Sequence, residues 1–387
     1  MRSRSARVDN GGPILNYDRF LGLPVSEVPT PALVIDIAAL KHNLVTMRDA
    51  CAEQKRSWRP HGKSHKSPAI ARLQLSYGAG GICAAKLGEA EVFVQAGVND
   101  VLITAPVIGR HKIERLLALH ASTPELKFVA DSVVNVREVG SMAASHGRKL
   151  KVLIDVNVGQ NRTGVDTPED AVTLAREIGN QPALELDGIQ AYAGTNQHIV
   201  GYDRRRDSEF EAIARAIRVR DALRSEGFSL ETLSVGGTGT YKADLHAEGV
   251  TEIQPGSFIF MDSHYRSIGN EVGAVYSDFG QALTVMTTII SRPSRSRAIT
   301  DGGNKALPTD EGLATTIGLS GAEYRPGGDE YGILEVRQAN HRLAVGDKVS
   351  FVPGHCDTTV NLFDRFFVGL DGVVEAIWPI AARGHSE

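Results

Sequence analysis

The chain has 387 residues, of which 42% are hydrophobic and 23% are charged, and its formal net charge is -4 at pH 7. This composition excludes a chain that is disordered throughout, and it offers no basic face for nucleic acid or an anionic membrane. The length exceeds the roughly 250–300 residues that usually share one hydrophobic core, so we expect a large domain with a smaller companion. Because the composition offers no basic face for nucleic acid or membrane, small molecules are the expected partners.

The cysteines and the N-terminal residues indicate a cytoplasmic protein. Cys51, Cys83 and Cys356 are too few and too scattered for a disulfide framework. The basic opening "MRSRSARVDNGG" is not followed by the apolar segment of a signal peptide, and no run approaches the ~18 apolar residues of a membrane span. We interpret residues 1–28 as an N-terminal tail and lead-in, and we expect no association with a membrane.

Short β-rich runs alternate with segments of helical period from residue 57 onward, which is typical of parallel strands joined by helices. The eight predicted strands are "SWRPHGK", "GGICAAK", "DVLITAP", "LKFVADS", "LKVLIDV", "LDGIQAY", "TLSVGGT" and "EIQPGSF". Eight such units predict a TIM barrel over residues 29–270, and a doubly wound open sheet is the alternative. The early segment "TPALVIDIAALKHNL" is either the first unit of this α/β barrel or a strand of a second domain.

Residues 271–387 have a different pattern, in which β-like runs follow one another without helices between them. The runs are "LTVMTTIIS", "ILEVRQA", "DKVSFVP" and "FFVGLDGVVEAIWPI", and turns rich in Gly and Asp separate them. This pattern predicts a C-terminal all-β domain.

Polar residues follow the predicted barrel strands at the ends where active sites of TIM barrels lie. They are Lys63 and His65 after the first strand, Lys86 after the second, Asp131 after the fourth, Arg162 after the fifth, and Tyr192 and His198 after the sixth. The loops after the last two strands contain Gly236, Gly237, Thr238, Gly256 and Ser257. Glycine backbones and hydroxyls of this kind cradle a phosphate, although plain turns are the alternative interpretation.

A lysine beside a phosphate cradle suggests the amine that forms a Schiff base with pyridoxal phosphate. Lys63 is the candidate, and we expect burial to lower its pKa and make it nucleophilic. A solvated surface lysine is the alternative. His65 and Lys66 are interpreted as supports of this loop and of the next helix.

The stretch "FVPGHCDTTVN" provides a second candidate site. If it is extended, His355 and Asp357 lie on one face while Cys356 points the other way. An imidazole and a carboxylate suit Mn²⁺, Mg²⁺ or Co²⁺ better than Zn²⁺, so the pair is a candidate half-site for a divalent metal. A polar loop without a metal is the alternative.

Many blocks of this chain resemble the fold-type III pyridoxal-phosphate enzymes, and among them the D-threonine aldolases and their relatives. The blocks, from residue 29 to 384, are "TPALVID", "RPHGKSHK", "GICAAKLGEAEVFVQAG", "GQNRTGV", "GIQAYAGTNQH", "GGTGTY", "QPGSFIFMD", "PGHCDTTVN" and "WPIAARG". The resemblance implies an alanine-racemase-like homodimer, in which each subunit joins a barrel that binds pyridoxal phosphate to a β domain.

The resemblance also implies a role for each candidate residue. Lys63 is expected to bind the cofactor covalently, with Arg162 near its phenolic oxygen and Tyr192 close to its ring. His198 is expected to be the base near the substrate's β-hydroxyl. The residues expected to contact the phosphate are Gly237, Thr238, Gly256 and Ser257. His355 and Asp357 are expected to bind a divalent metal, for which Mn²⁺ is the first candidate.

Three departures from the family pattern bear on function. Gln254 stands where the racemase branch has an arginine that faces the pyridine nitrogen. Tyr331 replaces a histidine in "DEYG", and the block from Asp301 to Lys305 reads "DGGNK" where the family has Asp-Ala-Gly-x-Lys. Asp357 takes the place of a cysteine found in the related D-serine dehydratases, which favours an aldolase.

We therefore expect an aldolase that cleaves D-threonine, or other D-3-hydroxy amino acids, to glycine and an aldehyde. Cleavage of 3-hydroxy-D-aspartate to glycine and glyoxylate is a close alternative. Dehydration of D-serine or D-3-hydroxyaspartate, with release of ammonia, is another. A non-catalytic carrier of pyridoxal phosphate is disfavoured because such single-domain proteins lack the β domain.

Overall fold

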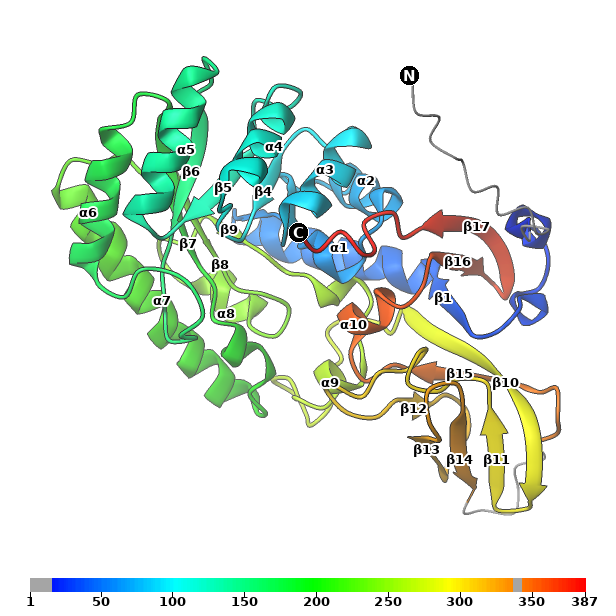
Figure 1. Cartoon of the computed structure of the whole chain (residues 1–387). Coiled ribbons are helices and arrows are strands. Elements are labelled where there is room, and N and C mark those ends of the chain that lie inside the picture. The colour runs from blue at the N-terminus through cyan, green and yellow to red at the C-terminus, as the bar shows by residue number, and fades with distance from the viewer. Residues whose placement is uncertain (1–15, 337–342) are drawn as a thin grey trace, which may run out of the picture.

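The computed structural model describes residues 16–336 and 343–387. Residues 1–15 of the expected tail and residues 337–339 of the run "ILEVRQA" lie outside this range. The described residues form one sheet of eight strands and a second sheet of nine. Figure 1 shows a larger body with many helices beside a smaller body made mostly of strands.

The eight-stranded sheet is the predicted barrel. Its strands are β2 (Ser57–Trp58), β3 (Ile82–Ala84), β4 (Val101–Ile103), β5 (Lys127–Ala130), β6 (Leu150–Asp155), β7 (Leu184–Ala191), β8 (Thr232–Val235) and β9 (Glu252–Ile253). The order is β2-β9-β8-β7-β6-β5-β4-β3, and all neighbouring pairs are parallel. The two end strands meet at an isolated parallel bridge between His61 and Cys83. All eight predicted strands are therefore confirmed.

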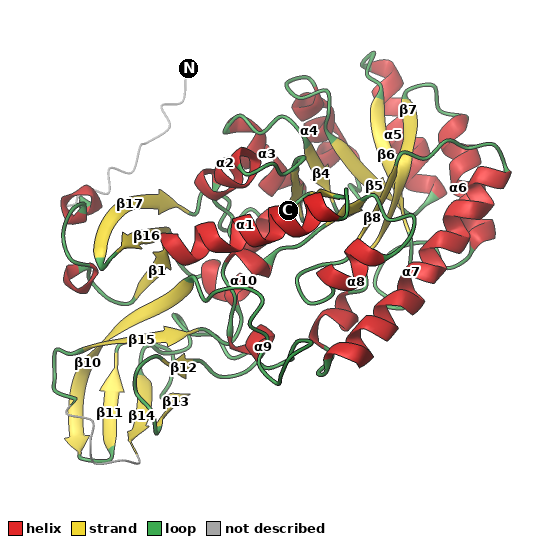
Figure 2. Ribbon diagram, turned by 180° about the vertical axis from the view of Figure 1, so that it is seen from behind, coloured by secondary structure: helices red, strands yellow, loops and turns green. Residues whose placement is uncertain are grey.

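Helices surround this sheet (Figure 2). They are α1 (Ile37–Glu53), α2 (Pro68–Ser76), α3 (Leu87–Gln95), α4 (Arg110–His120), α5 (Val133–Ser145), α6 (Pro168–Gly179), α7 (Tyr202–Ser225) and α8 (Tyr241–His246). Two of these helices, α1 and α6, start at a residue whose side chain caps the helical backbone. Asp36, for example, accepts hydrogen bonds from the backbone N–H groups of Ala38 and Ala39 at the start of α1.

The early apolar segment belongs to the second sheet. Its strand β1 (Ala32–Asp36) pairs antiparallel with β10 (Leu283–Ser294) and parallel with β16 (Arg365–Leu370). Of the two possibilities that the sequence leaves open, the strand shared with the β domain is the observed one. The chain therefore starts in one sheet, completes the barrel and then returns.

The rest of the second sheet confirms the predicted β-rich C-terminal part. Its other strands are β11 (Arg297–Thr300), β12 (Thr315–Thr316), β13 (Ala322–Pro326), β14 (Gly332–Val336), β15 (Lys348–Val352) and β17 (Val373–Pro379). Two short helices, α9 (Ser263–Arg266) and α10 (Cys356–Val360), interrupt the β pattern. Both lie between the barrel and the second sheet (Figures 1 and 2).

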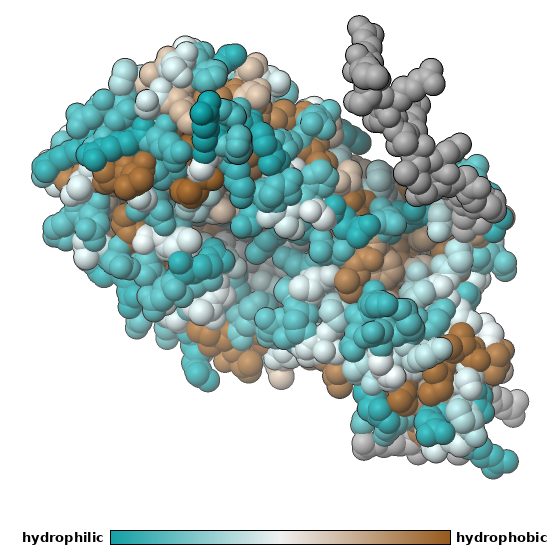
Figure 3. Space-filling model, in the orientation of Figure 1, coloured by the Kyte–Doolittle hydropathy of each residue, from teal (hydrophilic) through white to brown (hydrophobic). Residues whose placement is uncertain are grey.

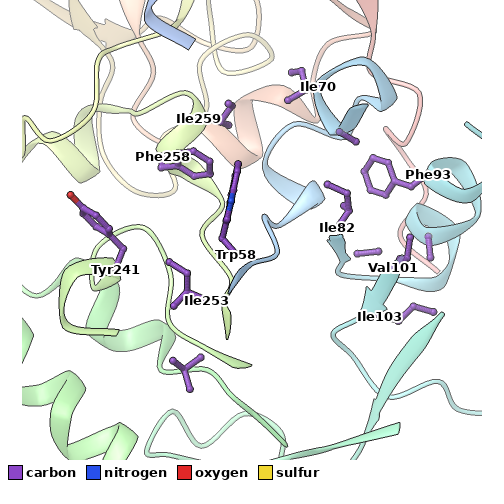
Figure 4. Packing of buried hydrophobic residues seen from close by; sticks show 14 of the residues in the cluster. Trp58, Ile70, Ile82, Phe93, Val101, Ile103, Tyr241, Ile253, Phe258 and Ile259 are labelled. Carbon is purple, nitrogen blue, oxygen red and sulfur yellow. The ribbon is translucent and has the colours of Figure 1, made fainter. Parts of the chain in front are cut away.

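The main hydrophobic core joins the outer face of the barrel sheet to the helices. Near β2, Trp58 packs edge-on against Phe258 with ring centroids 5.9 Å apart (Figure 4). The face in Figure 3 is mostly hydrophilic, with hydrophobic residues in separate patches. Within the described part of the chain, no helix has the length and apolarity to span a membrane.

Candidate active site

A cavity of about 330 Å³ opens at the carboxyl ends of the barrel strands, on the side of α10. All the residues assigned from the sequence to cofactor, catalysis or metal line this single cavity. They are Lys63, Arg162, Tyr192, His198, Gly237, Thr238, Gln254, Gly256, Ser257, His355 and Asp357. The fold thus brings eleven residues together from both ends of the described chain.

Lys63 lies in a 3-10 helix, η3 (Gly62–Ser64), which directly follows β2. Its Nζ atom is 4.0 Å from Oδ2 of Asp357 and 6.0 Å from the centre of the Tyr192 ring. Burial lowers the pKa of Lys63, but Tyr192 and Asp357 raise it, and the net pKa is above the ordinary value. The expectation of a lowered pKa is therefore wrong for the chain without cofactor, because Tyr192 and then the Asp357 carboxylate stabilise the ammonium.

The glycines of the two candidate phosphate loops leave no room for side chains. A Cβ on Gly237 would lie 2.6 Å from the Gln197 side chain, and one on Gly256 would lie 2.5 Å from Oγ of Ser64. The two loops are linked because Thr238 accepts a hydrogen bond from the backbone N–H of Phe258. Bare backbone with adjacent hydroxyls is the surface that a phosphate group fits.

A pair of buried carboxyl groups lies beneath the first of these loops. Asp244 accepts from the hydroxyl of Thr240 and hydrogen-bonds to Glu209, and neither acid is exposed to solvent. Among the described residues, Oε1 of Glu209 and Oδ1 of Asp244 have no other partner. A single proton held between the two acids would satisfy both oxygens. Burial raises the pKa of each acid.

Arg162 approaches the cavity from the loop after β6, with its guanidinium carbon 5.5 Å from the centre of the Tyr192 ring. Asp131, the strand-end residue noted in the sequence, is absent from the lining. It instead accepts a hydrogen bond from the backbone N–H of Gly164, so it supports the loop that bears Arg162.

His355 and Asp357 converge on the cavity, but their segment is not extended as expected. His355 is the extended residue before α10, and Asp357 lies in the first turn of that helix. The carboxylate of Asp262 accepts a hydrogen bond from the backbone N–H of Cys356, which favours a helix start at this point. Cys356 is fully buried, but its thiol donates a weak hydrogen bond to Oδ1 of Asp357 at 3.4 Å, so the expectation that it points away from the pair is wrong.

A further carboxylate contacts the metal candidate. Asp310, in the loop between β11 and β12, lies 2.7 Å from Nδ1 of His355 and accepts a hydrogen bond from the Thr358 hydroxyl. Burial lowers the pKa of His355, but Asp357 and Asp310 raise it above the ordinary value. In residues 16–336 and 343–387, no three His, Cys, Asp or Glu residues form a metal-binding group, so the pair needs other ligands.

His198 ends a 3-10 helix, η4 (Gly194–His198), and its ring stacks on that of His264 with centroids 4.0 Å apart. Its buried Nδ1 atom has no hydrogen-bond partner among the described residues. Burial, with smaller contributions from His264 and His355, lowers its pKa to about 3. The ring is therefore neutral at neutral pH, so one of its two nitrogens carries no proton.

Some expected residues lie elsewhere, and some cavity residues were missed. Tyr331 and the block from Asp301 to Lys305 do not line the cavity. Asp301 accepts hydrogen bonds from Thr30 and from the backbone of Thr288 within the second sheet. The missed lining residues include Gln190, which precedes Tyr192 by two positions and so shares its side of the chain at the end of β7.

Comparisons with known proteins agree with this architecture. Residues 35–264 match the family described as alanine racemase, N-terminal domain, and residues 282–369 match a putative serine dehydratase domain. The chain is 36% identical to 3-hydroxy-D-aspartate aldolase of Paracoccus denitrificans (strain Pd 1222), over 98% of this chain and 99% of that protein. It is 36% identical to D-threonine aldolase of Arthrobacter sp, over 94% and 95% of the two chains.

A solved structure shows the same fold. The crystal structure of D-threonine aldolase from Filomicrobium marinum superposes with a TM-score of 0.91 at 36% identity, and covers 95% of this chain and 99% of that one.

Proposed function

The chain belongs to the alanine-racemase-like family that includes D-threonine aldolase and 3-hydroxy-D-aspartate aldolase, and is a carbon–carbon lyase of this type; we propose that it cleaves D-threonine to glycine and acetaldehyde. The proposed enzyme is a cytoplasmic homodimer that uses pyridoxal phosphate and a divalent metal, Mn²⁺ in the first instance. One observation carries the proposal: the lysine and glycine loops of the barrel share a cavity with the His355–Asp357 pair.

The residues of the barrel wall fit pyridoxal phosphate, which the fold implies. Lys63 would bind its aldehyde carbon, the loops with Gly237 and Gly256 would take its phosphate, and the cationic Arg162 would face its phenolic oxygen. When bound, the cofactor withdraws electrons from the substrate's Cα, which is the chemistry that weakens the bond to Cβ.

The opposite wall would activate the substrate's hydroxyl. His355 and Asp357 offer an imidazole and a carboxylate, which with water suit Mn²⁺, Mg²⁺ or Co²⁺. A divalent ion held there would supply a Lewis acid that lowers the pKa of the β-hydroxyl. His198, which is neutral and lines the cavity, would accept the hydroxyl proton. The amine of Lys63 would then return a proton to Cα and complete glycine.

A specific observation favours 3-hydroxy-D-aspartate as the second candidate substrate. Lys86 lines the same cavity and makes no ion pair with any described residue. An unpaired ammonium would stabilise the second carboxylate of that substrate, whereas D-threonine has only a methyl group there. The variant Lys86→Met should therefore lower kcat/KM for 3-hydroxy-D-aspartate at least about tenfold, and leave kcat/KM for D-threonine nearly unchanged.

The first test is to load the purified protein with pyridoxal phosphate and Mn²⁺, add D-threonine, and assay the products. Glycine and acetaldehyde, lost on addition of EDTA, are expected. Ammonia with 2-oxobutanoate would instead assign the chain to dehydration, and no turnover of any D-3-hydroxy amino acid would contradict the proposal.

A further inference from the structure

The interior of the barrel is apolar on one side and polar on the other. Cys83, Leu102, Val129 and Leu153 form an apolar cluster inside strands β3 to β6. The strand register then places polar residues in one row from the end of β6 to β9: Asp155 in β6 opposite Gln190, Gln190 opposite Ser234, and Ser234 opposite Glu252. Branched apolar residues usually fill such barrels. A polar row therefore needs a complete set of hydrogen bonds.

Gln254 lies at the end of this row and lines the cavity. Its amide nitrogen donates to Oε1 of Gln190 at 3.2 Å and to Oγ of Ser234 at 2.9 Å. Gln254, Gln190 and Ser234 are all at most 5% exposed. The orientation of the Gln254 amide can therefore be deduced from the chemistry of its partners.

The Ser234 side requires the amide nitrogen at this position. Arg59, which has only donors, binds one oxygen of Glu252 at 3.0 Å, and the Ser234 hydroxyl donates to the other at 2.8 Å. Because the single hydrogen of Ser234 is used in that bond, its oxygen can only accept from Gln254. The atom of Gln254 that faces Ser234 must therefore be the NH₂ group.

The Gln190 side gives the same answer. Asp155 accepts from the Thr163 hydroxyl at 2.7 Å and from the amide nitrogen of Gln190 at 2.9 Å. Gln190 therefore turns its carbonyl oxygen toward Gln254, which again must donate. Burial raises the pKa of Asp155, but the argument through Glu252 does not depend on this acid. Asp155 and Glu252 lie at opposite ends of the row. Each of these carboxylates independently requires the same orientation of the Gln254 amide.

Both amide hydrogens of Gln254 are thus engaged, and the side chain offers the cavity an acceptor and no donor. Resting on the proposed function and on the place that Gln254 shares with the arginine of the racemase branch, we propose that Gln254 accepts a hydrogen bond from the protonated ring nitrogen of pyridoxal phosphate. Asp155 and Glu252 act as positioning residues, because they orient the amide through Gln190 and Ser234.

The orientation of the Gln254 amide affects the protonation state of the cofactor's ring nitrogen. An arginine at this position offers only donors, so it favours an unprotonated ring nitrogen. The carbonyl oxygen of Gln254 favours the protonated nitrogen, and a positively charged ring withdraws electrons from the substrate more strongly. The replacement of arginine by glutamine therefore changes which form of the cofactor the barrel stabilises.

The direct test is ¹⁵N NMR of the holoenzyme loaded with ring-¹⁵N pyridoxal phosphate. At neutral pH the wild type and the variant Gln254→Glu should show the protonated nitrogen, and Gln254→Arg the unprotonated one. A binding test uses the deaza analogue, whose ring has C–H in place of nitrogen. The wild type should bind it about tenfold or more weakly than the natural cofactor, and Gln254→Met should bind the two almost equally. Gln281→Met, which removes a partly buried amide outside the cavity, is the matched control.

Three outcomes would overturn the inference. An unprotonated ring nitrogen in a wild-type protein that shows the visible absorbance of the lysine-bound cofactor would contradict it and leave the proposed function intact. Equal binding of the cofactor and its deaza analogue by the wild type would do the same. A chain that binds no pyridoxal phosphate at all would overturn both proposals.

Discussion

The two walls of the cavity are built in different ways. The barrel wall takes its residues from loops that directly follow successive parallel strands, such as Lys63 after β2 and Tyr192 after β7. The opposite wall gathers residues from separate short segments between the barrel and the second sheet, such as Tyr265 in α9 and the pair His355 and Asp357 at the start of α10. The register of the barrel sheet determines the positions of the residues in the barrel wall. The positions of the residues in the opposite wall depend on how the two domains pack against each other.

This difference suggests that the two walls have different functions, which experiments can test separately. If the barrel wall holds the cofactor and the opposite wall holds the metal, then damage to one wall should spare the function of the other. The expected effects decrease from the covalent lysine to the buried carboxyl pair.

The largest effect is expected from Lys63→Ala on the barrel wall. Without the amine, the cofactor has no covalent attachment, so visible absorbance of the bound cofactor and turnover should both fall to the limit of detection. Absorption spectra and product assays measure the two losses. Retention of the wild-type spectrum would show that another lysine binds the cofactor.

Asp357→Ala should have the next largest effect, and on the other wall. Loss of the carboxylate should reduce metal-stimulated turnover at least about a hundredfold, because the Lewis acid is no longer held beside the hydroxyl. The spectrum of the lysine-bound cofactor should persist. The exposed Asp364, which pairs with Arg383, provides the control Asp364→Ala. Unchanged stimulation by Mn²⁺ in Asp357→Ala would contradict the metal assignment.

Asp310→Asn tests the metal site separately from the barrel, because the hydrogen bonds of the Asp310 carboxylate go to His355 and Thr358. It should weaken Mn²⁺ binding roughly 10–100-fold, since a carboxylate that orients a ligand histidine also makes it more basic. Electron paramagnetic resonance of free Mn²⁺ during a titration measures this affinity, and cofactor binding should not change. Equal weakening in Glu330→Gln, a change in a distant exposed ion pair, would indicate a general effect on the domain.

The smallest effect is expected from Glu209→Gln, beneath the phosphate loop. Because burial raises the pKa of Glu209 and Asp244, the folded state keeps a proton that the unfolded chain releases. This part of the stability is present at low pH and is lost as pH rises from the ordinary carboxyl pKa through the raised one. An amide keeps the contact without that proton, so the variant's melting temperature should fall less than the wild type's as the pH rises above the ordinary carboxyl pKa. Identical pH slopes would argue against a shared proton.

The barrel half was predictable because its signals are local. Apolar runs identified all eight strands, and functional residues follow those strands within a few positions. The segment of His355 and Asp357 was misjudged as extended, because its Thr-Thr-Val sequence suits a strand and the bond from Cys356 to Asp262 spans 94 positions.

No local pattern in the sequence predicts the contacts of the opposite wall. Asp310 lies 45 positions from His355, and no spacing or periodicity links the two. The raised pKa of Lys63 likewise depends on Asp357 from the far end of the chain. Packing between domains decides both, and a pattern within one segment does not record it.

The place of β1 has a consequence for the growing chain on the ribosome. This strand is made before any barrel strand, yet its partners β10 and β16 lie beyond the entire barrel. At roughly 5–20 residues per second, β1 waits on the order of tens of seconds for those partners. Its apolar residues Leu33 and Ile35 are fully buried in the complete fold. The nascent chain therefore exposes the unpaired edge of β1 until about its last hundred residues emerge. We expect chaperones to be most important during this interval, because an unpaired strand edge promotes aggregation.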